Sequence, residues 1–220
     1  MVDSATVAGK RTYGDPCGVA RALDVIGERW ALLIVRELLL GPKRFTDLRA
    51  GMPTLSPDVL SQRLRELEQA GVVQRASLPP PAGSRVYELS EWGRELEPVV
   101  LGLGRWASHR APFPPGDAAL GADSLMLGLK TLYDPGRADG VLHSSFELRL
   151  GEHRFEARPD DRGLEVSRGG VTDPVATISA DPGTLEQILW HGQPLNTATA
   201  TITGDRQAAE RFLAMFPLPD

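Results

Sequence analysis

The sequence predicts an α+β protein in which two parts of different character follow one another. Apolar residues recur at helical spacing from about residue 19 to residue 67, whereas the alternation typical of strands dominates after about residue 143. Between them lies HRAPFPPGDAALGADS, residues 109–124, whose prolines and glycines are typical of a linker. We therefore expect one domain at residues 1–112, a linker at 113–123 and a second domain at 124–220.

The first domain is predicted to contain four helices before its first strand. Within PCGVARALDVIGERWALLIVRELLLG, Gly27 separates two helical segments, and Gly41-Pro42 ends the second. The segment RFTDLRAG predicts a short third helix. Ser56 and Pro57 open a fourth, because serine caps a helix and proline is tolerated in its first turn.

After the fourth helix the periodicity changes. In residues 72–90, two segments with the pattern of β-strands lie on either side of a Pro/Gly-rich tip, which predicts a β-hairpin. Ser90 then caps a last helix that runs through Trp106. Four helices, a hairpin and a helix, in that order, predict a winged helix-turn-helix.

The fourth helix has one side for the core and one that is polar. Leu60, Leu64 and Leu67 form the apolar stripe, and three polar residues lie about 100° or more around the helix axis. Such residues are either solvated or in contact with base edges, where Arg suits guanine, Gln suits adenine and Ser fits either. The neighbouring basic segments favour base contacts, and the residues expected to make them are Ser61, Gln62 and Arg65.

Other residues are candidates for phosphate contacts. Lys and Arg side chains at the ends of helices and strands can reach the DNA backbone, and the free N–H groups at the start of a helix can bind a phosphate. For Arg85 the alternative is a pairing with Glu88 or Glu91. The expected phosphate-contact residues are Lys43, Arg44, Ser56, Pro57, Arg63 and Arg85.

Charge is distributed unevenly along the chain. The 220 residues carry a net charge of −5, but residues 1–112 carry +2, residues 113–220 carry −7, and residues 43–85 alone carry +3. A basic stretch in an acidic chain is typical of a nucleic-acid-facing module joined to a module of another kind.

Residues 13–110 resemble the HxlR family of bacterial winged-helix transcription regulators. The matching features are Cys17 and Trp106, together with ERWALLIVRELLLGPKRFTDL, LSPDVLSQRLRELEQAGVVQR and RVYELSEWGREL. The resemblance implies a homodimer on a palindromic promoter operator in double-stranded DNA, with the fourth helix in the major groove and the hairpin along the backbone. It also implies dimer contacts from about residues 16–26 and 91–110, where Leu103 and Trp106 either cross the two-fold axis or belong to the core.

Cys17 has two interpretations. Some HxlR proteins sense oxidants through a cysteine near this position, and a helix start and Arg21 favour a reactive thiol here. The adjacent Asp15 and the lack of a second cysteine favour a packed, unreactive residue. We expect the packed form, with a redox role as the alternative.

The second domain is predicted to be a mainly antiparallel sheet packed by helices. A short amphipathic helix at 124–133 precedes four strands in HSSFELRL, HRFEARP, GLEVSR and VATISA. A helix capped by Asp181, a strand in ATATIT and a helix after Gly204-Asp205 complete the order.

Residues 124–217 resemble sterol carrier protein type 2 in the order of these elements. The resemblance rests most on PVATISADPGTLEQILWHGQP and ATATITGDRQAAERFLAMF. It implies an apolar cavity for a fatty-acyl or sterol-like ligand. The combination of such a cavity with a DNA-binding domain suggests that the ligand shifts the dimer between DNA-competent and incompetent arrangements. The alternative is a filled cavity in a domain that only braces the dimer. The same side chains could instead be plain core. The expected lining residues are Phe146, Leu148, Phe155, Leu185, Leu189, Trp190, Ile202, Phe212 and Phe216.

The sequence contains no catalytic constellation. Its four histidines lack the spacing of metal ligands, and nucleophile-elbow, phosphate-loop and dinucleotide motifs are missing. We expect no enzyme activity, no cofactor and no metal. The alternative function is a lipid or fatty-acyl carrier whose second domain is the active module.

The expected location is the cytoplasm. The longest apolar run, residues 31–35, is far shorter than the roughly 18 residues of a membrane span. The segment MVDSATVAGK has no apolar signal region, and the single cysteine excludes an internal disulfide framework.

Overall fold

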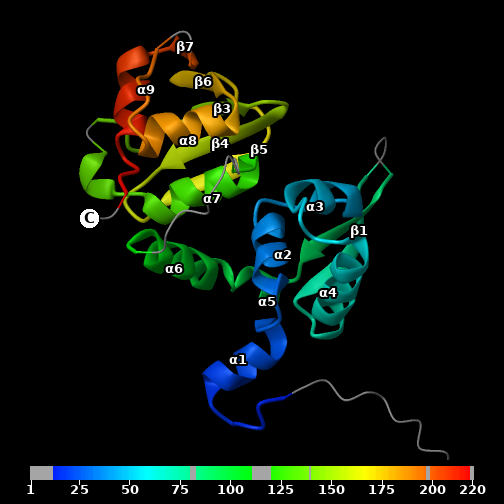
Figure 1. Cartoon of the computed structure of the whole chain (residues 1–220). Helices are drawn as coiled ribbons and strands as arrows, with labels where there is room; N and C mark the ends of the chain where they lie inside the picture. The colour runs from blue at the N-terminus through cyan, green and yellow to red at the C-terminus, as the bar shows by residue number, and fades with distance from the viewer. Residues whose placement is uncertain (1–11, 80–82, 111–119, 139, 197–198, 219–220) are drawn as a thin grey trace, which may run out of the picture.

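The computed structural model describes residues 12–79, 83–110, 120–138, 140–196 and 199–218. Within these ranges the first half of the chain forms helices and a two-stranded hairpin, and the second half forms a five-stranded sheet with helices (Figure 1). The predicted α+β class is therefore confirmed.

The first half has the predicted order of elements. Strands β1 and β2 pair antiparallel and form the wing. The elements are α1 Gly18–Ile26, α2 Ala31–Leu38, α3 Phe45–Gly51, α4 Pro57–Gln69, β1 Val73–Ser77, β2 Arg85–Leu89, α5 Glu91–Arg94 and α6 Glu97–Ser108.

The last helix of this half differs from the prediction, because it is divided into α5 and α6. The division follows from Pro98, which lies in the first turn of α6. Proline has no backbone N–H, so it cannot donate to the carbonyl of Arg94 and continue α5.

Side-chain caps begin several helices where the sequence predicts them. The Ser56 hydroxyl accepts a hydrogen bond from the Val59 N–H, at 3.4 Å, and Ser90 accepts one from Gly93 at 3.0 Å. In the second half, the Asp181 carboxylate accepts one from the Thr184 N–H at 2.9 Å. These caps satisfy N–H groups that have no partner within the helix.

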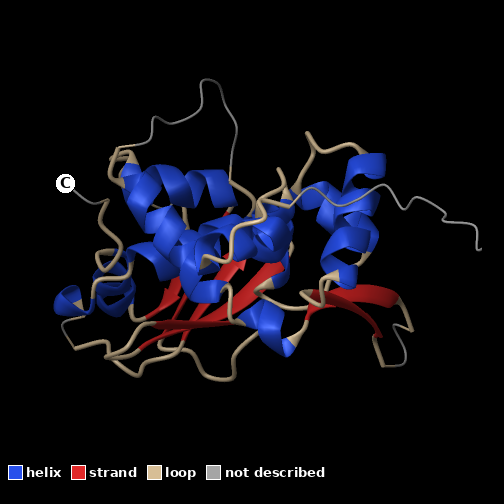
Figure 2. Cartoon of the chain, turned by 90° about the horizontal axis from the view of Figure 1, so that it is seen from below, coloured by secondary structure: helices blue, strands red, loops and turns tan. Residues whose placement is uncertain are grey.

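The second half is a mixed sheet with helices. The strand order is β5-β4-β3-β6-β7; β3 and β6 are parallel, and the other neighbours are antiparallel. The helices lie over one face of the sheet (Figure 2). The elements are α7 Ala122–Leu132, a 3₁₀ turn Pro135–Arg137, β3 Phe146–Leu150, β4 His153–Pro159, β5 Leu164–Arg168, β6 Ala176–Ala180, α8 Pro182–Trp190, β7 Thr201–Gly204 and α9 Arg206–Leu213.

Helix α7 differs from the amphipathic helix predicted at 124–133, because most of its length is buried. It runs between the sheet on one side and α2 and α6 on the other (Figure 1). Gly104 of α6 approaches Thr131 so closely that a Cβ would lie 3.3 Å from its methyl group, and Arg105 donates two hydrogen bonds to the Thr131 carbonyl, at 3.0 and 3.1 Å. A helix with protein on both sides needs apolar residues all round.

The start of α7 also shortens the predicted linker. The helix begins at Ala122, so Asp123 belongs to it rather than to a linker at 113–123. Residues 113–119 of that linker lie outside the described residues. The domain boundary at residue 112 stays a prediction.

A chain ending at residue 112 is expected to fold, because the hydrophobic cluster of the first half extends no further than Val100. Loss of α7 would expose Leu40 and Leu101, which pack in the cluster of the second half. We expect the fragment to lose about 3–6 kcal/mol of stability, at roughly 1.5–3 kcal/mol for each of the two leucines. Urea denaturation followed by circular dichroism measures this; a random-coil fragment would place the boundary elsewhere.

Candidate nucleic-acid interface

Helix α4 is anchored by its leucine stripe. Leu60, Leu64 and Leu67 are fully buried and pack in the cluster that contains Ile34 and Val35 of α2. A helix held on one side by this packing presents its other side in a fixed orientation.

The opposite side of α4 carries the polar residues predicted to contact bases. Gln62 and Arg65 are exposed, and Ser61 is half-buried. The Gln62 side-chain amide donates to a Glu66 carboxylate oxygen at 3.0 Å. Among the described residues, Arg65 has no ion-pair partner, so its guanidinium is available for a bidentate contact to a base.

The wing presents Arg85 to solvent. This residue is exposed and lies opposite Ser77 across the hairpin. Glu88, the partner considered in the alternative interpretation, instead accepts a hydrogen bond from the Gln74 amide at 2.7 Å. Among the described residues Arg85 forms no ion pair with Glu88 or Glu91, so its exposed side chain can contact a phosphate.

Three more of the predicted phosphate-contact residues are exposed. Arg44 directly precedes α3, and its backbone N–H donates to the Asp47 carboxylate at 3.2 Å. Ser56 and Pro57 lie at the start of α4, beside the exposed Asp58.

Arg63 does not suit the predicted role. Only 14% of its side chain is exposed, and the guanidinium contacts Glu66 and, at 3.3 Å, Glu28. A phosphate contact would require both ion pairs to open. We therefore assign Arg63 to the packing of α4 against the turn before α2.

The position of Lys43 departs further from the prediction than that of Arg63. From its place at the end of an element, Lys43 was expected to reach a phosphate, but it is only 7% exposed. Its ammonium lies 2.5 Å from a carboxylate oxygen of Glu37 in α2 and also contacts the carboxylate of Asp123 in α7. Lys43 is thus not available to a phosphate, because α7 of the second half covers it. The sequence signal that was missed is Asp123 itself, a charged residue in the first turn of a mostly apolar helix.

The residues predicted to line an apolar cavity are packed against one another. The Phe146 and Phe212 rings stack with centroids 4.4 Å apart, and Phe212 meets Phe216 edge-on at 5.1 Å. The Trp190 indole N–H donates to the Phe216 carbonyl at 3.0 Å. Phe146, Leu148, Phe155, Leu185, Phe212 and Phe216 are fully buried, and Leu189, Trp190 and Ile202 pack around them.

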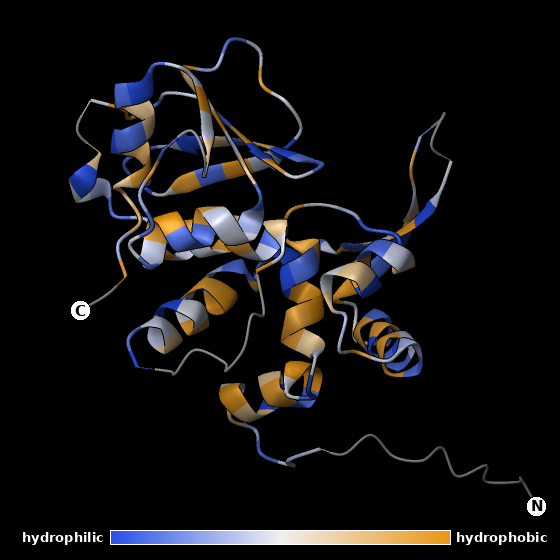
Figure 3. Cartoon of the chain, turned by 45° about the horizontal axis from the view of Figure 1, so that its top comes forward, coloured by the Kyte–Doolittle hydropathy of each residue, from blue (hydrophilic) through white to orange (hydrophobic). Residues whose placement is uncertain are grey.

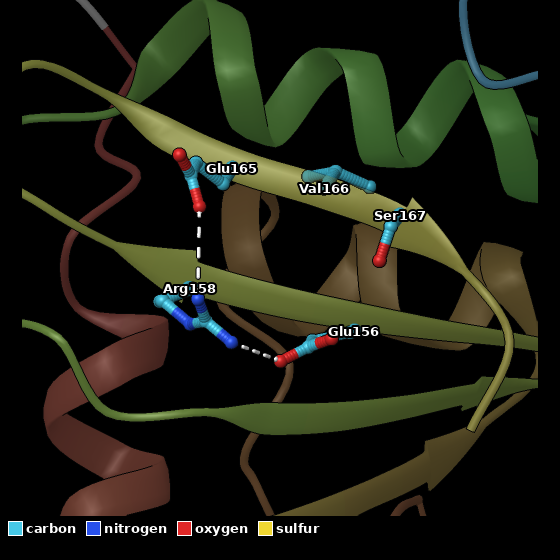
Figure 4. Close-up of a pocket in the computed structure, with 5 residues that line it drawn as sticks. All are labelled: Glu156, Arg158, Glu165, Val166 and Ser167. Atoms are coloured by element: carbon cyan, nitrogen blue, oxygen red, sulfur yellow. Dashed lines mark hydrogen bonds and ion pairs between the residues drawn. The ribbon is translucent and has the colours of Figure 1, made fainter. Parts of the chain in front are cut away.

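A pocket of about 330 Å³ lies elsewhere, on β4 and β5 (Figure 4). Arg158 lies 2.8 Å from Glu156 and 3.9 Å from Glu165, and Val166 and Ser167 complete the lining. None of the nine residues predicted to hold an apolar ligand contributes to it. Its charged lining does not suit a fatty-acyl chain.

Cys17 is exposed, so the expectation of a packed residue is wrong. It lies at the N-terminal end of α1, where the backbone N–H groups of Val19 and Ala20 hold the pKa of its thiol below the ordinary value. The Asp15 carboxylate accepts the Cys17 backbone N–H at 2.8 Å.

Within the described ranges, no helix has both the length and the apolar character needed to cross a membrane. The same ranges contain no group of three His, Cys, Asp or Glu side chains placed to hold a metal ion.

The fold and the exposed side of α4 define a winged helix-turn-helix DNA-binding protein. The family model described as HxlR-like helix-turn-helix matches residues 25–113. The chain belongs to this family, whose members are transcriptional regulators and not enzymes.

Two proteins of Bacillus subtilis illustrate the relationship. The transcriptional regulator YvaP is 41% identical over 89 residues, which are 40% of this chain and 82% of YvaP. The transcriptional regulator YodB is 38% identical over 96 residues, which are 44% of this chain and 84% of YodB.

Two solved structures are also similar to the first half. The redox regulator HypR in its oxidized form is 35% identical, with a TM-score of 0.41, and the match covers 44% of this chain and all of HypR. Reduced YodB from B. subtilis is 36% identical, with a TM-score of 0.39, over 46% of this chain and 98% of YodB. The family match ends at residue 113, so the resemblance of the second half to sterol carrier protein type 2 stays a prediction.

Because Lys43 is buried in ion pairs, its replacement should lower the stability of the folded protein. We expect Lys43→Ala to lower the free energy of unfolding by about 3 kcal/mol, because breaking a buried ion pair strands its carboxylates. The matched control is Arg44→Ala, which removes an exposed neighbour and should change stability by less than about 0.5 kcal/mol. Urea titration of both variants tests the assignment, and equal stabilities would place Lys43 at the surface.

Proposed function

We propose that the protein regulates transcription by binding a palindromic operator as a homodimer. Helix α4 enters the major groove, with Ser61, Gln62 and Arg65 at base edges. Arg44, Arg85 and the start of α4 contact phosphates and set the register. The observation that carries the proposal is the exposed polar side of α4, held opposite a buried leucine stripe.

An exposed apolar surface supports the dimer. Helix α6 has no buried residue among its twelve, and Val99, Leu103 and Trp106 lie along one side of it. Trp106 is 74% exposed, so it does not belong to the core of its own chain. Val19 and Leu23 of α1 are exposed as well, and hydrophobic residues run along both helices (Figure 3).

A two-fold axis through this surface would explain a palindromic site. A symmetric interface places two copies of α4 in opposite orientations, and each copy reads the same half-site. Helix α7 covers a different side of α6, so the described part of the second half leaves this surface open.

We do not extend the proposal to a fatty-acyl or sterol-like ligand. The side chains that would line its cavity fill the core of the second half. The same packing removes the support for the alternative in which the protein is a lipid carrier.

We also propose that Cys17 is a reactive thiol, in place of the packed residue expected from the sequence. Its exposure and the N–H groups that lower its pKa favour the thiolate, which is the nucleophilic form. Cys17 directly precedes α1, so modification would add bulk or charge beside the proposed dimer surface.

The division between base and phosphate contacts predicts different effects for two arginines. Arg65→Ala should lower the preference for a selected operator over random DNA by about 1–3 kcal/mol. Arg44→Ala should weaken binding to both duplexes alike and reduce the salt dependence by about one phosphate contact. Fluorescence anisotropy across a salt series, with a duplex selected from a random library, measures both. Identical behaviour of the two variants would refute the division.

The proposed dimer predicts a strong effect of Trp106→Glu. Placing a charge at the centre of an apolar interface should weaken association by about 2 kcal/mol or more. Val175→Glu is the control, because Val175 is also an exposed apolar residue but lies in the second half, outside the proposed dimer surface. Sedimentation velocity should show a monomer for the first variant and a dimer for the second. A monomeric wild type would contradict the proposal.

The lowered pKa of Cys17 predicts that its thiol is alkylated at lower pH in the folded protein than in the unfolded protein. Iodoacetamide should react with the folded protein at a rate whose pH midpoint lies below that of the urea-unfolded protein. Cys17 is the only cysteine, so no other thiol contributes to the measurement. A midpoint equal to or above that of the unfolded chain would show that the helix start does not activate the thiol.

A further inference from the structure

Lys43 joins three parts of the molecule. Its ammonium contacts Glu37 of α2 and Asp123 of α7. Its backbone pairs with Tyr87 of the wing through two hydrogen bonds, at 2.9 and 2.8 Å. One residue therefore holds the DNA-binding unit at two points and the second half of the chain at a third.

Glu37 extends this connection to both ends of α3. Its carboxylate contacts Lys43, which precedes the helix, and lies against Gly51 at the helix end. A Cβ at position 51 would lie 2.4 Å from a Glu37 oxygen, so any other residue there would require the Glu37 carboxylate to move. The position of α3 thus depends on a carboxylate that Lys43 holds in place.

Asp123 is fixed to the sheet of the second half. Its carboxylate contacts Arg168 of β5, and the Arg168 guanidinium lies over the Phe155 ring, 5.0 Å from its centroid. Both Asp123 and Lys43 are more than nine-tenths buried. Polar groups this deeply buried strongly favour the arrangement in which their charges are paired.

From these contacts we infer that Asp123 is a positioning residue for DNA recognition and acts through Lys43. Movement of Asp123 would shift the turn before α3 and the wing strand that pairs with it. Reading of bases by α4 and of phosphates by the wing requires these elements to keep a fixed geometry. The inference rests on the proposed function, and it makes the second half of the chain part of the DNA-reading unit.

A second ion pair between the halves provides a control. Lys130 of α7 contacts Glu97 of α6, away from α3 and the wing. Loss of this pair weakens the contact between the halves but leaves Lys43 in place. If Asp123 acts by positioning, only its own replacement should alter DNA discrimination.

The test is a double-mutant cycle of Asp123→Asn and Lys43→Gln, with Lys130→Gln as the control. Each full-length variant is titrated with a duplex selected by the wild type from a random library, and with a random duplex of equal length. The readout is the discrimination ratio, which is the dissociation constant for the random duplex divided by that for the selected duplex. Partial unfolding lowers binding to both duplexes alike and leaves the ratio unchanged, whereas a positioning defect lowers it.

We expect Asp123→Asn and Lys43→Gln each to lower the ratio about tenfold. The double variant should lower it no further than either single change, because both act on one contact. Lys130→Gln should keep the wild-type ratio. If Asp123→Asn does not fold, as judged by circular dichroism, Arg168→Gln takes its place and should lower the ratio by a smaller factor.

Three results would overturn the inference: a wild-type ratio in Asp123→Asn or its substitute, effects that multiply in the double variant, or an equal loss in Lys130→Gln. A wild type that shows no preference for any duplex would instead refute the proposed function. The two failures are therefore distinguishable.

Discussion

The buried ammonium of Lys43 is the constraint on which the arrangement of this protein depends. A charge removed from water is stable only where opposite charges and hydrogen bonds replace the lost hydration. Glu37 supplies one carboxylate from the DNA-binding half, and Asp123 supplies the other from the second half. Because both are needed at one point, the two halves cannot take up independent orientations without exposing or stranding the charge.

The position of α7 and the exposure of α4 and α6 are consistent with these buried ion pairs. Helix α7 carries Asp123 and is buried along most of its length, since it belongs to the core of the second half and also covers α2 and α6. The polar side of α4 and the apolar side of α6 both remain exposed. As far as the structure describes it, the second half therefore supports the DNA-binding unit without covering either surface that the proposed function requires.

Local features of this structure could be predicted from the sequence, and contacts between distant segments could not. Ser56, Ser90 and Asp181 begin helices where they were predicted, because a cap depends on neighbouring residues only. Lys43 was assigned to a phosphate because it lies at the end of a predicted element, and only the packing of α7 reveals its burial. The exposure of Cys17 and the filled core around Phe212 likewise depend on tertiary packing, which residue spacing does not determine.

Backbone ¹⁵N relaxation tests most directly whether Lys43 and Asp123 join the halves into one body. The rotational correlation time can be determined separately for amides in α2–β2 and for amides in β3–β6. A rigid connection requires the same correlation time in both sets. Two different values, with one half tumbling faster than the other, would show that the buried ion pairs do not hold the halves together.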